Sequence, residues 1–187
     1  FRFVNTVSLA DQTSTTIVAN IKNMFLDSLV TGQYVTQAQK ISILNQLTSQ
    51  PSSVLHLQYS KTTGMNLSLS GSASDIVIGS NIPDIINAGG GNDQLFGGGG
   101  KDLYKFSGVF GNDRIIDTDN SGQIQIDASF LTGGEFIRGS LSNAVSKDGK
   151  FKFALNGSTL VITRVNDSTQ NAISIENWKN GDVGITL

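Results

Sequence analysis

Residues 88–105 read AGGGNDQLFGGGGKDLYK, which divides into two nine-residue units with an aspartate at the sixth position and an apolar residue at the eighth. The same spacing extends toward the N-terminus, so that an aspartate recurs at every ninth position over four units. These aspartates are Asp75, Asp84, Asp93 and Asp102, and the apolar residues that follow them are Val77, Ile86, Leu95 and Tyr104. The pattern is the nonapeptide G-G-x-G-x-D-x-U-x, which predicts a β structure built from stacked repeats.

A glycine-rich turn followed by three extended residues cannot bury its single apolar side chain alone. Stacked turns solve this problem, because successive apolar side chains then line one narrow core. Glycine lets the turn backbone adopt positive φ angles and brings its carbonyl oxygens close together. Carbonyls and carboxylates form an all-oxygen environment that suits Ca²⁺ with its roughly 6–8 ligands. We therefore predict a calcium-binding roll in which the ion offsets the repulsion among stacked aspartates.

If each nonapeptide is half a coil, alternate repeats lie on the same side of the roll. Asp75 then faces Asp93 on one side. Asp84 faces Asp102 on the other side.

A fifth, displaced unit spans residues 108–115 and keeps an aspartate, Asp113, and the apolar residue two positions later. A two-residue insertion, Phe106 and Ser107, separates it from the fourth unit. On the half-coil rule, Asp113 completes a site with Asp93.

The predicted metal ligands are the repeat aspartates and the backbone of the glycine-rich turns. They are Asp75, Asp84, Ala88, Gly89, Gly90, Gly91, Asn92, Asp93, Gly97, Gly98, Gly99, Gly100, Lys101, Asp102, Gly108, Phe110 and Asp113.

With these motifs, residues 70–116 resemble the RTX repeats of proteins that Gram-negative bacteria secrete by the type I pathway. The resemblance implies a parallel β-roll with Ca²⁺ between turns, bound by turn carbonyls and the sixth-position aspartates. It also implies secretion to the extracellular space or the cell surface, with the type I machinery as a partner. The first two units depart from the pattern; in the second, Ile82 replaces a glycine and Pro83 follows it.

Composition excludes several classes of function. Charged residues make up 15% of the 187-residue chain and the net charge is −2, so nothing favours binding to nucleic acid or to an anionic membrane. There is no cysteine, which excludes thiol chemistry and zinc–cysteine sites and fits secretion without disulfides. No apolar run approaches the roughly 18–20 residues of a membrane helix. Because the chain opens at Phe1 without a signal-peptide pattern, we expect a fragment or processed form of a larger protein.

Two helices are predicted before the repeats. Residues 11–30 carry apolar side chains at helical spacing. A second helix begins at Thr36 with a capping box that includes Gln39. Its apolar side chains are Ile41, Leu44 and Leu47.

Two alternating strands, at 55–59 and 65–69, then lead into the roll. His56 lies in the polar phase of the first strand, so we expect it at the surface or at a strand edge. The whole segment is interpreted either as a cap over the N-terminal end of the roll or as the tail of an upstream domain.

From residue 123 the pattern changes to antiparallel β structure. Alternating apolar residues at 151–155 and 160–162 flank Asn156 and Gly157, a strong hairpin signal. A further strand at 172–175 leads to Trp178, and 183–187 is predicted to be the last strand. Most of residues 120–187 resembles the haemolysin-type calcium-binding-related domain, which implies that the type I export signal lies near the C-terminus.

Residues 117–122 copy the first half of an EF-hand loop, with Ile124 at the eighth position. The twelfth position is Ala128 instead of the bidentate glutamate. Two interpretations remain open: a polar turn at the end of the roll, or an additional calcium site.

The fold expected is mainly β: a calcium-binding parallel β-roll with a short N-terminal helical segment and a C-terminal antiparallel β capping module. Residues 1–69 form the N-terminal cap or tail, 70–118 the roll, and 119–187 the C-terminal cap.

The leading functional hypothesis is an extracellular calcium-binding module whose folding is triggered by Ca²⁺ after secretion. The first alternative is a self-assembling adhesin, surface-layer or extracellular filament subunit. The second is the C-terminal part of a secreted toxin, lipase or protease. No catalytic function is expected, because the chain has one histidine and lacks the G-x-S-x-G, H-E-x-x-H and P-loop motifs.

Overall fold

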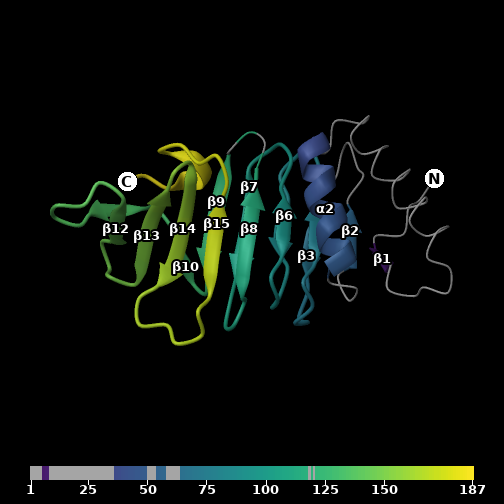
Figure 1. Cartoon of the computed structure of the whole chain (residues 1–187), viewed down its shortest axis with the longest axis horizontal. Helices are drawn as coiled ribbons and strands as arrows, with labels where there is room; N and C mark the ends of the chain where they lie inside the picture. The colour runs from purple at the N-terminus through teal and green to yellow at the C-terminus, as the bar shows by residue number, and fades with distance from the viewer. Residues whose placement is uncertain (1–5, 9–35, 50–53, 58–63, 118, 120) are drawn as a thin grey trace.

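The computed structural model describes residues 6–8, 36–49, 54–57, 64–117, 119 and 121–187, and they form two sheets that run along the molecule (Figure 1). The ten-stranded sheet A has the order β1-β2-β4-β6-β8-β15-β14-β13-β12-β11. The five-stranded sheet B has the order β10-β9-β7-β5-β3. The prediction of a mainly β fold with a parallel β-roll is confirmed.

The roll consists of parallel strands that alternate between the two sheets. In sheet A these are β4 (Ile76–Ile78), β6 (Gln94–Phe96) and β8 (Asn112–Ile116). In sheet B they are β3 (Asn66–Ser68), β5 (Ile85–Asn87), β7 (Asp102–Phe106) and β9 (Gly122–Ile126). Val77 pairs with Leu95, and Ile86 pairs with Tyr104, so a strand pairs with the strand two nonapeptides further on. The half-coil rule is therefore correct.

The eighth position of every repeat lies inside the roll. Val77, Ile86, Leu95 and Tyr104 are completely buried and belong to one hydrophobic cluster with Ile115 of β8. Burying an apolar side chain of this size stabilises a fold by roughly 1.5–3 kcal/mol. The period that defines the repeat thus also supplies the core.

The helix α2 (Gln37–Ser49) begins at the predicted capping box. The Gln39 backbone N–H donates to Thr36 Oγ1 at 3.2 Å, and the Thr36 N–H donates to Gln39 Oε1 at 2.6 Å. Two otherwise unpaired donors at the helix start are satisfied in this way. The helix predicted over residues 11–30 lies outside the described residues.

The face that α2 turns toward sheet A differs from the one predicted. Gln46 Nε2 donates to the Ser74 carbonyl at 3.1 Å, and Ile43 is fully buried. Ile41, which was expected in the core, is 54% exposed, and the side chain of Leu47 lies outside the described part of the chain. The helix thus contacts the roll through polar groups as well as through Ile43.

The prediction that His56 lies at the surface is wrong. β2 (Val54–Leu57) joins sheet A between β1 (Thr6–Ser8) and β4, with His56 paired to Val77 and only 5% exposed. Its Nε2 lies 3.6 Å from Asp75 Oδ1. His56 points inward because it pairs with Val77, whose side chain lies in the core of the roll.

After the roll, sheet A continues as an antiparallel layer, as predicted. β15 (Ala172–Ile175) pairs in parallel with β8 and antiparallel with β14 (Thr159–Arg164). The predicted hairpin joins β14 to β13 (Phe151–Asn156), with Asn156 paired to Thr159. The layer ends with β12 (Asn143–Ser146) and the edge strand β11 (Gly134–Phe136).

The last segment is not the strand that alternation predicted. Residues Asp182–Gly184 form the short 3-10 helix η1, and beyond it Thr186 makes a single bridge to Gly133. η1 contacts β9, which forms a hairpin with β10 (Ser129–Phe130), and Val183 and Ile185 are completely buried. The segment therefore closes the roll core as an irregular plug.

No helix among the described residues is long and apolar enough to cross a membrane.

Candidate metal centre

The glycine-rich turns stack in two rows, one before the strands of each sheet. Row one contains turns 70–75, 88–93 and 108–113, which precede β4, β6 and β8. Row two contains turns 79–84 and 97–102, which precede β5 and β7. The predicted backbone ligands lie in the second turn of each row and in the third turn of row one.

The aspartates of row one form a ladder. The Asp75 backbone N–H donates to Asp93 Oδ1 at 2.7 Å, and the Asp93 N–H donates to Asp113 Oδ1 at 2.9 Å. All three side chains are buried. The structure thus brings together the residues that the half-coil rule paired.

Row two repeats the arrangement with Asp84 and Asp102. The Asp84 N–H donates to Asp102 Oδ1 at 2.9 Å, and the Met65 N–H donates to Asp84 Oδ1. Asp102 thus holds turn 79–84, and Asp84 holds the residue that precedes β3.

The second oxygen of three of these aspartates has no partner. Asp93 Oδ2, Asp102 Oδ2 and Asp113 Oδ2 are buried and accept no hydrogen bond in the described part of the chain. Burial raises the pKa of Asp93 to about 7 and that of Asp102 and Asp113 to about 8, and neighbouring carboxylates add to each shift. Backbone hydrogen bonds partly oppose these shifts.

These pKa shifts show what the metal-free roll lacks. An aspartate whose pKa is raised by folding contributes its full stabilisation when the pH is below its pKa in the unfolded chain, which is near 4. This contribution is lost as the pH rises to the folded-state pKa of about 8. At neutral pH the buried carboxylates therefore oppose folding unless a cation compensates them. Their free oxygens fit a hard cation such as Ca²⁺.

Asp84 differs because both of its oxygens already accept hydrogen bonds. The Ser80 N–H donates to Asp84 Oδ2 at 2.6 Å, and the Ser80 hydroxyl donates to Oδ1 at 3.0 Å. Ser80 stands at the second position of its unit, where the repeat pattern has glycine. The serine hydroxyl thus adds a hydrogen bond to Asp84 Oδ1, and the backbone of the same residue occupies Oδ2, the oxygen that is left free in the later units.

The turns also bring backbone oxygens against one another. Gly91 has φ +124°, and a Cβ added to it would lie 2.0 Å from the carbonyl oxygen of Ala73 in the preceding turn of row one. Only glycine permits this approach. In the described ranges no group of three or more His, Asp or Glu side chains could hold a metal ion, so a cation in the rows needs these carbonyls as well as the carboxylates.

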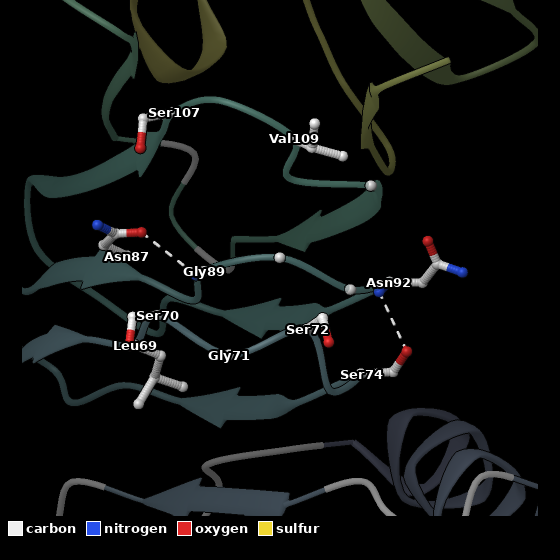
Figure 2. Close-up of a pocket in the computed structure, with 13 residues that line it drawn as sticks. Leu69, Ser70, Gly71, Ser72, Ser74, Asn87, Gly89, Asn92, Ser107 and Val109 are labelled. Atoms are coloured by element: carbon white, nitrogen blue, oxygen red, sulfur yellow. Dashed lines mark hydrogen bonds between the residues drawn. The ribbon is translucent and has the colours of Figure 1, made fainter. Parts of the chain in front are cut away.

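An open groove of about 750 Å³ runs across the turns of row one (Figure 2). Ser74 Oγ accepts the Asn92 N–H and Asn87 Oδ1 accepts the Gly89 N–H, so polar side chains tie the turns at the groove (Figure 2). Val109 also lines it.

Phe110 was predicted as a ligand residue of the fifth unit, and its side chain is part of the core. Its ring centroid lies 5.2 Å from that of Phe106. The guanidinium carbon of Arg164 lies over the Phe110 ring, 4.8 Å from its centroid. Only its backbone carbonyl is suited to a metal site, and that role stays a prediction.

Asn171, a residue that the sequence did not single out, closes row one. Its Oδ1 accepts the N–H groups of Phe110 and Gly111 at 3.1 and 2.9 Å, and its Nδ2 donates to the Gly108 carbonyl at 3.2 Å. The side chain is 1% exposed. The neutral amide of Asn171 therefore bonds the backbone groups of turn 108–113 that a further turn of row one would otherwise bond.

We expect Asn171→Ala to destabilise the chain by roughly 2–4 kcal/mol, because buried donors lose their acceptor. Urea unfolding at saturating calcium measures the change, with Asn143→Ala, at an exposed position, as the control. Equal unfolding midpoints for the two variants would contradict this role.

Row two ends differently, in the segment that copies half an EF-hand loop. The Gly100 N–H donates to Asp119 Oδ2 at 2.8 Å, and the Ser121 hydroxyl donates to the Gly100 carbonyl at 2.6 Å. Tyr104 donates its buried hydroxyl to Asp117 Oδ2 at 2.8 Å. The segment thus provides a polar turn over turn 97–102.

The rows of carboxylates and carbonyls define a calcium-binding β-roll. Residues 69–104 match the family model of the RTX calcium-binding nonapeptide repeat, in four copies. This part of the chain therefore consists of calcium-binding RTX repeats, as the nine-residue period predicted. The match does not extend to residues 120–187, whose resemblance to a second RTX-associated domain stays a prediction.

Among solved structures, the chain is similar to the AlgE6R3 subunit of the mannuronan C5-epimerase from Azotobacter vinelandii, determined in solution. The two are 25% identical, the match covers 63% of this chain and 78% of that one, and the TM-score is 0.32. No curated protein matches the chain by sequence.

Proposed function

We propose that this chain is an extracellular module that folds when calcium fills its rows of turns, after secretion by the type I pathway of a Gram-negative bacterium. The observation that carries the proposal is the free, buried oxygen on each of Asp93, Asp102 and Asp113. A bound cation compensates these groups, and nothing in the described part of the chain replaces it at those oxygens. RTX repeats are typical of extracellular proteins, which supports this location.

The expected affinity explains how calcium acts as a trigger. Extracellular calcium modules have dissociation constants near 10⁻⁴–10⁻³ M. Such sites stay empty where calcium is scarce and fill in a calcium-rich medium. Each site occupied at about 100 times its dissociation constant adds roughly 2.7 kcal/mol to folding. Several sites together are enough to fold a marginally stable chain.

Removal of calcium is therefore expected to unfold the roll. Far-UV circular dichroism at millimolar calcium should show β structure that is lost when a chelator is added and regained when calcium is restored. Magnesium at the same concentration serves as the control, because it demands a smaller octahedral site and dehydrates reluctantly. A spectrum unchanged by chelation would contradict the proposal.

The three segments have separate roles in this proposal. Residues 70–118 bind calcium, and 119–187 cap the roll and carry the export signal. Residues 1–69 cap the other end, which the pairing of β2 with β4, the first roll strand of sheet A, supports. We propose that the chain is non-catalytic and belongs to a larger secreted or surface protein, whose catalytic part, if it is a toxin, lipase or protease, lies elsewhere.

One observation favours self-assembly as a second function. The edge strand β11 and the loop after it expose Phe136, Ile137 and Leu141, the last of these at 94%. Unpaired sheet edges with apolar side chains are sites of association.

If this edge acts as an interface, light scattering should show calcium-dependent oligomers. Leu141→Ser should then reduce the mass without changing the circular dichroism. A monomer in both the presence and absence of calcium would exclude this function.

A further inference from the structure

Two buried carboxylates from different turns lie near the Tyr104 hydroxyl at the end of row two. Asp102 belongs to the last repeat and is 1% exposed, and its Oδ2 has no hydrogen-bond partner. Asp117 belongs to the turn that follows the repeats and is 7% exposed.

Tyr104 and Gly97 fix the geometry between these two carboxylates. A Cβ added to Gly97 would lie 2.5 Å from Asp102 Oδ2 and 1.9 Å from the Tyr104 hydroxyl oxygen. That same hydroxyl donates to Asp117 Oδ2 at 2.8 Å. The Asp102 and Tyr104 oxygens therefore lie against one glycine, which leaves the space that a side chain would fill, and the Tyr104 hydroxyl connects them to Asp117.

The two rows end in opposite ways. Asn171 closes row one with a neutral amide that satisfies backbone groups and adds no further carboxylate to that row. Row two ends in a second carboxylate, and in the described part of the chain no Lys, Arg or His pairs with Asp102. Two buried like charges at close range are strongly unfavourable without a cation.

We propose that a divalent cation of the calcium type binds between Asp102 and Asp117, at a position that the nonapeptide repeats do not supply. The inference rests on the calcium function proposed above and adds to it a site formed by the junction of the roll with the C-terminal module. Asp119 organises the turn, because its oxygens accept the N–H groups of Gly100 and Ser121. The ion holds this turn against turn 97–102, and so links β7 to β9 at the end of the repeats.

Asp117→Asn tests the site by removing the charge. Its single amide oxygen can replace only one of the two Asp117 oxygens, which accept the Tyr104 hydroxyl and the Asp119 N–H, so circular dichroism at saturating calcium checks that the variant folds. Calcium per chain is counted by equilibrium dialysis with radioactive calcium, with Asp148→Asn, in an exposed hairpin, as the matched control. We expect Asp117→Asn to bind one ion fewer than the unaltered chain, and Asp148→Asn to bind the same number. An unaltered count in Asp117→Asn would overturn the inference.

A crystal structure of the unaltered chain with terbium in place of calcium provides a measurement that needs no variant. Anomalous scattering should place an ion at coordination distance from both Asp102 and Asp117. Ions in row one and between Asp84 and Asp102, with none at Asp117, would overturn this inference and leave the calcium function intact. A chain that binds no ion at all would overturn both.

Discussion

Asp93→Asn is expected to prevent folding at calcium concentrations that fold the unaltered chain. Asp93 lies in the middle of row one, where its Oδ1 holds the N–H of Asp75 and its own N–H is held by Asp113. Its Oδ2 accepts no hydrogen bond in the described part of the chain, and the half-coil rule assigns Asp93 to one site with Asp75 and to a second with Asp113. An asparagine keeps an oxygen for the ladder and removes the charge that the ion requires.

The size of the effect follows from the number of sites lost. Two sites that each contribute roughly 2.7 kcal/mol amount to about 5 kcal/mol. This equals the lower limit of the net stability of a typical domain, about 5–15 kcal/mol. Circular dichroism during a calcium titration should show the folding midpoint of Asp93→Asn shifted upward by at least tenfold, or no transition.

Asp84→Asn is the comparison for this variant within the same motif. Both oxygens of Asp84 already accept hydrogen bonds from Met65 and Ser80, so the loss of its charge should shift the calcium midpoint less. Asp148→Asn should leave the midpoint unchanged. If Asp84→Asn and Asp93→Asn shift the midpoint equally, the free oxygens of row one are not the determinants of calcium binding.

The repeat period predicted the roll because a single geometric rule controls it. Once each nonapeptide is half a coil, the pairing of Val77 with Leu95 and the ladder from Asp75 to Asp113 both follow. Local turn chemistry was similarly sufficient for the hairpin at Asn156 and for the capping box of α2.

The failures arose where long-range pairing decides the environment of a residue. Alternation placed His56 in a polar phase, but its pairing with Val77 turns it into the roll. Apolar residues also alternate at Val183 and Ile185, which predicted a last strand, and both side chains are indeed buried. The left-handed φ angles of Gly181 and Gly184 produce a 3-10 turn there instead.

The ends of the two rows show the same limit within the site itself. Asn171 lies about sixty residues from the turn that it closes, and no period marks it. Asp117 carried a local signal, the half EF-hand motif, but only the stacking of its turn on 97–102 reveals its contact with Tyr104 of the last repeat. A repeat pattern describes its own interior well, whereas its termini depend on the neighbouring modules.

Gly111→Ala is expected to destabilise the chain by roughly 3–5 kcal/mol, because it combines left-handed strain with a collision that the turn cannot relieve. Gly111 has φ +88°, and an added Cβ would lie 1.8 Å from the carbonyl oxygen of Gly91 in the turn below. Its N–H is held by Asn171, and its carbonyl accepts the Ala172 N–H at 2.9 Å. The turn is thus tied on the side opposite the collision and has no direction in which to move away.

Gly139→Ala separates the collision from the strain of a positive φ. Gly139 has nearly the same φ, +82°, but no heavy atom lies within 4 Å of an added Cβ. It should therefore show only the cost of the left-handed conformation, about 1–2 kcal/mol. Urea unfolding of both variants at saturating calcium measures the difference directly. If the two variants lose equal stability, the stacked turns do not approach as closely as the roll requires, and the carbonyl-lined gaps proposed for calcium are absent.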